Sequence, residues 1–370
     1  MRRSRLILTG LLSTALVGTL GVGLQQAVGT RADEAQQPAA AEKACGLNAK
    51  LVPNCPRQFL FGASANPDGR GNGKKPWEQY MNEAQQRYQR AITIRRNFHP
   101  AGSKPPLTRG TSDGDSEIRY ARTGTGIVMV NYKPDANWKK AASPTGPAAE
   151  RLRQFAKNVK AVTPHKVMIV LYHEPQNDVH HGSSCKTHKE GTVKDNTPAT
   201  YRAMWRNARA IFDREGVKNA VWVMNYMGYK NWDCMVQDMW PGNDLVDWVA
   251  WDEYSNNNGR TWNQTIGHMY QLLTDKSDAR HNFRSKPWMV GETGVSHCDR
   301  NVVRNFYKGA LNSTTQNRFP KVKAYVWWDS RDEKGDFRTH LDCKGKSSPT
   351  ELGYFRQFAS NPLMIKKIRN

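Results

Sequence analysis

The chain has 370 residues and carries 55 Lys and Arg against 33 Asp and Glu, a formal net charge of +22. Its length allows one large domain or two ordinary ones. Its basic residues are scattered, with no arginine-rich tract and no helix-turn-helix or RNA-binding signature, so we exclude nucleic acid as a partner. The charge instead predicts a solvated basic surface that can adhere electrostatically to acidic cell-wall polymers.

The N-terminal segment has the pattern of a secretory signal. Arg2, Arg3 and Arg5 precede an apolar run over residues 6–24, which is a basic region followed by a hydrophobic one. A retained membrane anchor is the alternative, although this run is barely long enough to span a bilayer. We therefore expect a signal peptide over residues 1–30, a linker and N-terminal segment over 31–56, a catalytic domain over 57–370, and a secreted, extracellular protein.

Six cysteines follow the predicted signal, at positions Cys45, Cys55, Cys185, Cys234, Cys298 and Cys343. An even number of cysteines in an exported chain predicts three disulfides. Cys185 and His188, with His180 and His181 nearby, could instead suggest zinc, but their spacing fits no standard zinc site. We expect no metal and no organic cofactor.

Short apolar runs alternate with segments of helical periodicity along the chain. The predicted strands cover residues 59–65, 91–98, 126–132, 167–173, 220–226, 244–251, 287–292 and 322–328. The predicted helices cover residues 77–90, 148–162, 198–215, 261–278, 301–312 and 350–359, and residues 108–123 are ambiguous.

This alternation predicts an α/β fold, the (β/α)8 TIM barrel. The strands are apolar throughout, which is typical of strands whose two faces are both covered. A doubly wound sheet would alternate similarly, but no G-x-G-x-x-G follows the first strand, and a Rossmann fold thereby loses its main support.

A TIM barrel places its site at the carboxyl ends of its strands, and polar and aromatic residues gather at those ends here. They are His99, His173, Glu174, Asn225, Tyr254, Glu292, Trp327 and Trp328. Glutamates ending the fourth and seventh strands would face each other across the barrel, as in a retaining glycosidase. There, one carboxylic acid protonates the leaving oxygen and the other carboxylate attacks the anomeric carbon, from about 5–5.5 Å away.

Several segments carry a resemblance to a known family. The stretch WPGNDLVDWVAWDEYS, residues 240–255, resembles the region between the fifth and sixth strands of glycoside hydrolase family 26. The pair His173-Glu174 also resembles that family, whose clan relatives mostly carry Asn-Glu, and KPWMVGETG and AYVWWDS are similar to its last two strands. The resemblance covers about residues 57–360.

The resemblance implies roles for individual residues. Glu174, flanked by His173, would be the acid/base, and Glu292 the nucleophile, with Tyr254 donating a hydrogen bond to it. Trp327 or Trp328 would form a platform under the sugar; the two alternate on one strand, so only one can face the cleft. His99 and Asn225 are further candidates for sugar binding, although His99 could equally be a hydrogen-bonded rim histidine.

The chain departs from the β-mannanases of that family near Glu174. Val170 stands where they commonly carry arginine, and no tryptophan follows Glu174 closely. We therefore expect a secreted, monomeric retaining β-glycanase acting on β-mannan or a related β-glucan or xylan. The alternatives are a carbohydrate-binding barrel without turnover, and a basic scaffold attached to the cell wall.

Two further expectations concern the loops and the acid. Adjacent loops bring Cα atoms within disulfide range, which predicts the pairs Cys185–Cys234 and Cys298–Cys343. Cys45 and Cys55 lie close together in sequence near the start of the domain, which predicts the third pair, Cys45–Cys55. Burial and the charge of Glu292 should raise the pKa of Glu174, so His173 should be neutral when Glu174 is to act as an acid.

Overall fold

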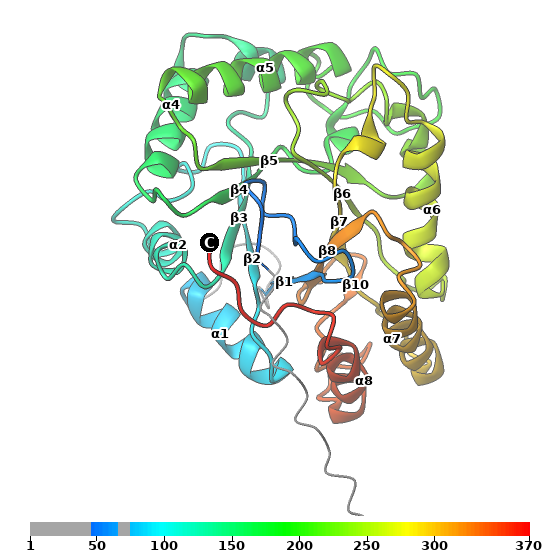
Figure 1. Ribbon diagram of the computed structural model, residues 1–370. Coiled ribbons are helices and arrows are strands. Elements are labelled where there is room, and N and C mark those ends of the chain that lie inside the picture. Colours follow the sequence, from blue (N-terminus) through cyan, green and yellow to red (C-terminus); the bar gives the residue numbers. More distant parts are fainter. Residues whose placement is uncertain (1–45, 66–74) are drawn as a thin grey trace, which may run out of the picture. The chain divides into compact units, whose positions relative to one another are not determined.

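Eight parallel strands close into a barrel, and each strand pairs with the next one along the chain (Figure 1). The strands are β1 (Leu60–Ser64), β2 (Ile94–His99), β3 (Ile127–Tyr132), β4 (Val167–Leu171), β5 (Ala220–Met227), β6 (Trp248–Asp252), β7 (Trp288–Thr293) and β8 (Val322–Trp328). Leu60 of β1 pairs with Ala324 of β8 and so closes the ring. The predicted (β/α)8 barrel is confirmed.

The structure is a computed structural model, and it describes residues 46–65 and 75–370. The predicted signal peptide, most of the predicted linker and Cys45 lie outside the described residues. Within the described part of the chain, no helix is both long enough and apolar enough to cross a membrane.

Helices surround the barrel and cover the outer face of its strands (Figure 1). They are α1 (Trp77–Tyr88), α2 (Ser112–Arg122), α3 (Trp138–Ala142), α4 (Pro147–Lys160), α5 (Pro198–Arg214), α6 (Trp262–Asp275), α7 (Arg300–Thr315) and α8 (Pro349–Ala359). The ambiguous segment 108–123 contains α2, whose first turn is capped by Thr111 accepting a hydrogen bond from the Gly114 amide.

Short elements in the loops complete the architecture. They are the 3-10 helices η1 (Pro175–Asp178), η2 (Lys230–Met235) and η3 (Phe283–Ser285) and the hairpin of β9 (Arg331–Asp332) and β10 (Gly335–Asp336). Strand β6 begins at Trp248, four residues later than the apolar run predicts. Asp247, the residue just before it, uses its carboxylate to accept a hydrogen bond from the Trp222 amide at 2.9 Å.

Two apolar layers follow from the alternation of side chains along each strand. Leu60, Ile94, Met168 and Met289 belong to the cluster that fills the barrel, while a larger cluster packs the strands against the helices. Each fully buried apolar side chain of this size stabilises the fold by roughly 1.5–3 kcal/mol. The filled barrel leaves the carboxyl ends of the strands as the place for a site.

Candidate active site

A cavity of about 390 Å³ opens where strands β1 to β4 and β6 to β8 end. It is lined by Ser64, Trp77, Asn97, Phe98, His99, Pro100, Asn131, Lys133, His173, Glu174, Tyr254, Glu292, Trp328, Asp332 and Lys334. The structure therefore brings six of the eight predicted catalytic and substrate-binding residues into one cavity, and leaves Asn225 and Trp327 outside its lining.

Glu174 reaches the cavity through an unusual backbone turn. Strand β4 ends at Leu171, and Tyr172 and Glu174 then adopt left-handed φ angles of 62° and 48°. Such angles are uncommon for residues other than glycine and are concentrated at functional sites. The Glu174 amide donates to the carbonyl of Asn225 at 3.1 Å, which ties this turn to β5.

The surroundings of Glu174 favour its protonated form. Burial and then the nearby charge of Glu292 raise the pKa of Glu174 to about 8, although Lys334, Arg96 and Lys133 oppose the rise. Its carboxyl accepts a hydrogen bond from Asn177 Nδ2 at 3.2 Å. Glu174 therefore holds a proton at neutral pH, in agreement with the expectation from the sequence.

Glu292 lies on β7 in a different setting. Arg96 Nη2 lies 3.0 Å from Glu292 Oε1, and the Tyr254 hydroxyl donates a hydrogen bond to Glu292 Oε2. A fixed cation and a fixed hydroxyl thus face the two oxygens of this carboxylate. The predicted hydrogen bond from Tyr254 is present.

Arg96 is the main site residue that the sequence did not single out. It is fully buried and donates to the Gly291 carbonyl at 2.6 Å and to Asn131 Oδ1 at 2.9 Å, besides contacting Asp252 at 3.4 Å. Burial lowers the pKa of Arg96, but Glu292 and Asp252 outweigh this, and the net change is upward. The available signal was an arginine inside a buried strand, which requires partners for its charge.

Asp252 and Asn225 form a supporting pair below the cavity. Asn225 Nδ2 donates to Asp252 Oδ2 at 2.7 Å, and both side chains are buried. Burial and then Glu292 raise the pKa of Asp252 well above its usual value. The structure thus corrects the prediction that Asn225 contacts the sugar. Its side-chain amide donates to Asp252 inside the barrel, and Asn225 does not line the cavity.

The pKa values of the two histidines in the cavity are shifted in opposite directions. Burial, followed by Lys133 and Arg96, lowers the pKa of His173 well below its usual value, so His173 is neutral, as expected. His99 instead has a raised pKa, because Glu117 lies 2.7 Å from its Nε2 and outweighs burial. His99 is therefore the hydrogen-bonded rim histidine that the sequence left as one alternative, although it also lines the cavity.

The two adjacent tryptophans of β8 face opposite sides of the strand. Trp328 lines the cavity, with its ring edge-on to Phe98 at 5.4 Å. Trp327 is 1% exposed and stacks on Trp262 of α6 at 5.9 Å. This corrects Trp327 as a sugar contact, because its ring is enclosed between β8 and the surrounding helices.

Two lysines at the cavity were also missed by the sequence. Lys133 contacts Asp178 Oδ2 at 3.1 Å and lies over the Tyr172 ring, 4.4 Å from its centre. Lys334 comes from the turn between β9 and β10 and lies 5.3 Å from the centre of the Tyr229 ring. Lys133 directly follows β3, so the strand-end rule could have found it, whereas Lys334 lies in a loop hairpin that no apolar periodicity marks.

Two disulfides join neighbouring loops on the side of the cavity. Cys185 is bonded to Cys234 and Cys298 to Cys343, with Cα separations of 5.3 and 5.2 Å. Both predicted pairs are confirmed. The pair Cys45–Cys55 stays a prediction, because Cys45 lies outside the described residues.

The fold and the site define a (β/α)8 barrel with two glutamates at the carboxyl ends of β4 and β7. Residues 147–289, which include Glu174 but end before Glu292, match the model of glycosyl hydrolase family 26. This match confirms the predicted resemblance: the sequence from α4 to the start of β7 is similar to glycosyl hydrolase family 26.

The chain is also similar to individual known proteins. Endoglucanase H of Acetivibrio thermocellus is 26% identical over 182 residues, 45% of this chain and only 18% of that protein. The catalytic domain of a Bacillus sp. JAMB-750 endo-beta-1,4-mannanase superposes with a TM-score of 0.57 at 17% identity, covering 83% of this chain and 87% of that one. GH26C from Muricauda superposes with a TM-score of 0.56 at 14% identity, covering 86% and 89%. At these identities, the two structures establish the fold alone.

Proposed function

We propose that the protein is a retaining glycoside hydrolase that cleaves a β-linked polysaccharide by a two-glutamate double displacement. The observation that carries this proposal is the different environment of two carboxyls in one cavity. Burial and the neighbouring glutamate keep Glu174 protonated, whereas a buried arginine and a tyrosine hydroxyl face Glu292. Pairs of carboxyls with unlike surroundings are the usual basis for dividing acid and nucleophile roles.

The first step uses Glu174 as acid and Glu292 as nucleophile. Glu292 attacks the anomeric carbon while the Glu174 proton passes to the departing glycosidic oxygen, so that a glycosyl-enzyme ester forms and the shortened chain leaves. The negative charge of Glu292 is consumed in this step. Its contribution to the raised pKa of Glu174 disappears with it, and Glu174 becomes a stronger acid.

The second step uses the same two residues in reverse. Glu174, now ionised, removes a proton from water, the water oxygen attacks the anomeric carbon, and Glu292 leaves as a carboxylate. Two inversions restore the original anomeric configuration. Throughout, Arg96 and Tyr254 hold Glu292 in place, because each contacts a different oxygen of its carboxylate.

Sugar binding falls to the aromatic and polar groups of the cavity. The exposed part of Trp328 supplies an apolar surface for a sugar ring, and its edge-on contact with Phe98 fixes its orientation. Neutral His173 is placed to orient a sugar hydroxyl or Glu174, since it carries no charge that would lower the pKa of the acid.

We infer a β-mannan or a related β-glucan or xylan as substrate, cleaved inside the chain, and secretion of the enzyme. Support comes from the similar fold of the Bacillus endo-beta-1,4-mannanase catalytic domain and from the sequence relative endoglucanase H. Disulfides in the described part of the chain suit an oxidising compartment outside the cytoplasm.

The test is hydrolysis of a panel of β-mannan, mixed-linkage β-glucan and xylan by the wild type and by Glu292→Ala. We expect hydrolysis of at least one polymer by the wild type, loss of turnover in Glu292→Ala, and retention of the anomeric configuration in the NMR spectrum of fresh product. Binding of a polymer without turnover would favour a carbohydrate-binding barrel, and inversion would contradict the double displacement.

A further inference from the structure

A second cluster of reactive side chains lies outside the active site, in the loop that follows η1. The base of this loop is closed by two backbone hydrogen bonds, from the Gly191 amide to the Val179 carbonyl at 2.7 Å and from the His180 amide to the Asn196 carbonyl at 2.8 Å. The disulfide between Cys185 and Cys234 ties the far part of the loop to η2. The loop is therefore held at both ends.

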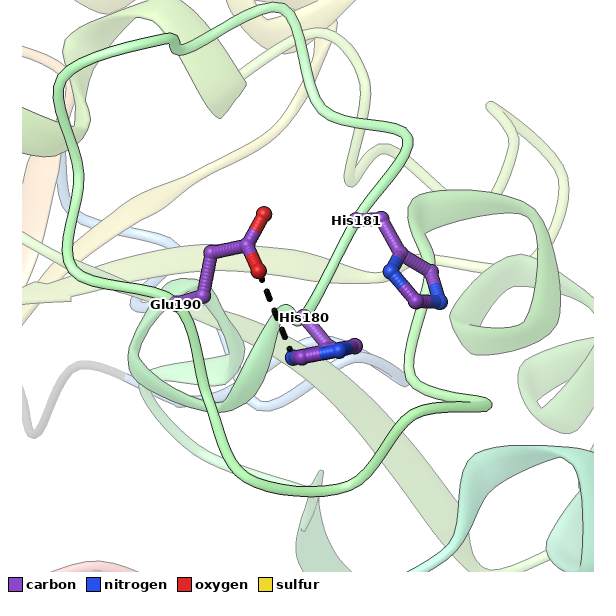
Figure 2. A group of neighbouring side chains, drawn as sticks. All are labelled: His180, His181 and Glu190. Atoms are coloured by element: carbon purple, nitrogen blue, oxygen red, sulfur yellow. Dashed lines mark ion pairs between the residues drawn. The ribbon is translucent and has the colours of Figure 1, made fainter.

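Three side chains of this loop gather at its base, as Figure 2 shows. His180, His181 and Glu190 each offer one ligand atom, and these atoms lie within 4.8 Å of one another. Glu190 Oε2 lies 3.4 Å from His180 Nδ1, and the two imidazole rings are 4.2 Å apart at their centres. The glycosidase mechanism uses none of these groups.

We propose that His180, His181 and Glu190 bind one divalent transition-metal ion of the zinc type. Two imidazoles and one carboxylate form a common set of protein ligands for zinc, with water completing the coordination. Calcium and magnesium prefer shells of oxygen ligands, and two of the three ligands here are imidazole nitrogens. Imidazole nitrogens also suit copper and nickel, so the proposal concerns this class of ion.

The orientation of His180 supports the proposal. Its Nδ1 lies 2.6 Å from the Gly191 carbonyl oxygen, a contact in which Nδ1 carries the proton and donates. The lone pair of Nε2 is then available, and metal-binding histidines almost always use their second nitrogen in this way. The ring is thus held in the tautomer that leaves Nε2 free for a metal, while Glu190, whose Oε2 lies 3.4 Å from Nδ1, would turn toward Nε2 to join it.

The remaining geometry needs only a small adjustment. Zinc–ligand bonds of about 2.0–2.1 Å place the ligand atoms of a tetrahedral site roughly 3.3 Å apart. The observed atoms are separated by up to 4.8 Å, so the cluster must contract by an ångström or more. His181 and Glu190 are exposed side chains and can rotate to do so without disturbing the core.

Other residues suggested by the sequence cannot serve as ligands here. Cys185 is consumed in a disulfide and offers no thiolate. His188 has its Nδ1 turned to the Cys185 carbonyl oxygen at 2.6 Å, and it lies outside the cluster. The set of His180, His181 and Glu190 therefore shares two histidines with the cluster weighed in the sequence, but it contains neither Cys185 nor His188.

An ion at this position would link the first part of the loop, at His180 and His181, to its later part, at Glu190, near the cavity wall. Gly191 lies against Asp178, since a Cβ at position 191 would come within 2.5 Å of the Asp178 carbonyl oxygen. Asp178 in turn holds Lys133, which lines the cavity. The ion would thus act as a structural clamp beside the active site, without taking part in the chemistry.

Titration calorimetry with zinc chloride on the untagged, chelator-treated chain tests the proposal. We expect one zinc ion per chain, a rise in the unfolding temperature on zinc addition, and no comparable effect of calcium chloride. His181→Ala and Glu190→Gln should each weaken zinc binding at least tenfold. Both residues are exposed, so these variants should retain the circular dichroism spectrum of the wild type.

His281→Ala is the matched control, because His281 also faces a carboxylate, with Nδ1 3.0 Å from Asp278 Oδ1, but belongs to no three-ligand cluster among the residues that the structure describes. It should bind zinc as the wild type does. The proposal is overturned if the wild type binds no zinc, if His181→Ala and Glu190→Gln bind it unchanged, or if His281→Ala loses binding equally. None of these readouts depends on glycosidase activity, so failure here leaves the proposed function untouched.

Discussion

Arg96 and Glu292 form an ion pair, with 3.0 Å between Nη2 and Oε1, at a position where Arg96 has no exposed surface. The same guanidinium contacts Asp252 and donates to the Gly291 carbonyl. Glu292 is thus oriented by a group that lies 196 residues earlier in the chain. This contact joins β2 to β7, and the charge of Arg96 also lowers the pKa of Glu174.

Replacing Arg96 by methionine should therefore cost both activity and stability. The change leaves Glu292 and Asp252 without their buried cation, and loss of one partner of a buried pair destabilises by about 3–5 kcal/mol. We expect kcat/KM to fall at least about 100-fold, as measured on the substrate identified by the polymer panel, and urea unfolding to report the loss of stability.

Arg95→Met is the control for this change. Arg95 is also buried, but it lies over the Tyr120 ring on the helix side of β2, 4.2 Å from its centre. Its loss should lower stability and leave kcat near the wild-type value. Equal losses of kcat in the two variants would contradict the assigned role of Arg96.

The acid and the nucleophile should separate on substrates with different leaving groups. Glu174→Ala lacks the proton donor, but an activated aryl glycoside needs no proton in the first step, so the glycosyl-enzyme should form and then accumulate. Azide should attack this ester and restore turnover. Glu292→Ala should be inactive on both kinds of substrate, and a Glu174→Ala variant with equal losses on both and no azide rescue would disprove the assignment.

The architecture was predictable because its signals are local. A buried parallel strand reads as an apolar run, and a surface helix as an apolar stripe, so the order of eight strands and their helices emerges from periodicity. Glu174 and Glu292 were found because a barrel collects strand ends at one rim. The two confirmed disulfides follow from the same rule, since they join adjacent loops.

The partners of buried charges were not predictable in this way. The sequence marks Arg96 as an arginine in an apolar strand, but its contacts with Asn131, Asp252 and Glu292 depend on the barrel register. The choice between Trp327 and Trp328 depends on the register too. Ala324 and Val326 of β8 lie inside the barrel and Tyr325 and Trp327 face the helices, and a strand that is apolar throughout does not reveal which set points inward.

The two tryptophans should therefore respond differently to truncation. Trp328→Ala removes an apolar surface of the cavity, so KM should rise markedly while the unfolding midpoint changes little. Trp327→Ala leaves a void among Trp262 and the helix side chains, which should destabilise by about 3–5 kcal/mol. Kinetics and denaturant unfolding of both variants test this, and a larger KM effect in Trp327→Ala would reverse the assignment.

Lys334 should tune the pH dependence of the acid. Lys334 lowers the pKa of Glu174, so its positive charge favours the ionised form. Lys334→Met removes that charge, so the pKa of Glu174 should rise. The alkaline limb of the activity profile should therefore move to higher pH. Lys157→Met, a matched loss of charge in α4, should leave the limb in place. A shift to lower pH in Lys334→Met would contradict this electrostatic role.

His173 offers the sharpest test of which group donates the proton. Its pKa lies well below its usual value, so it is neutral across the working range and has no titration to contribute near pH 8. The pKa of Glu174 is raised to about 8, and activity should therefore be present below that pH and be lost as the pH rises through it.

His173→Gln keeps a polar group and removes the imidazole. The variant should retain an alkaline limb, moved by no more than the change in local polarity allows, with a reduced kcat from poorer orientation of Glu174. Glu174→Gln should lose the limb, together with nearly all activity on unactivated polymer, because the amide has no carboxyl proton to donate. The pH profiles of kcat/KM for the wild type and both variants are the measurement. Loss of the limb in His173→Gln alone would make histidine the proton donor and remove Glu174 from that role.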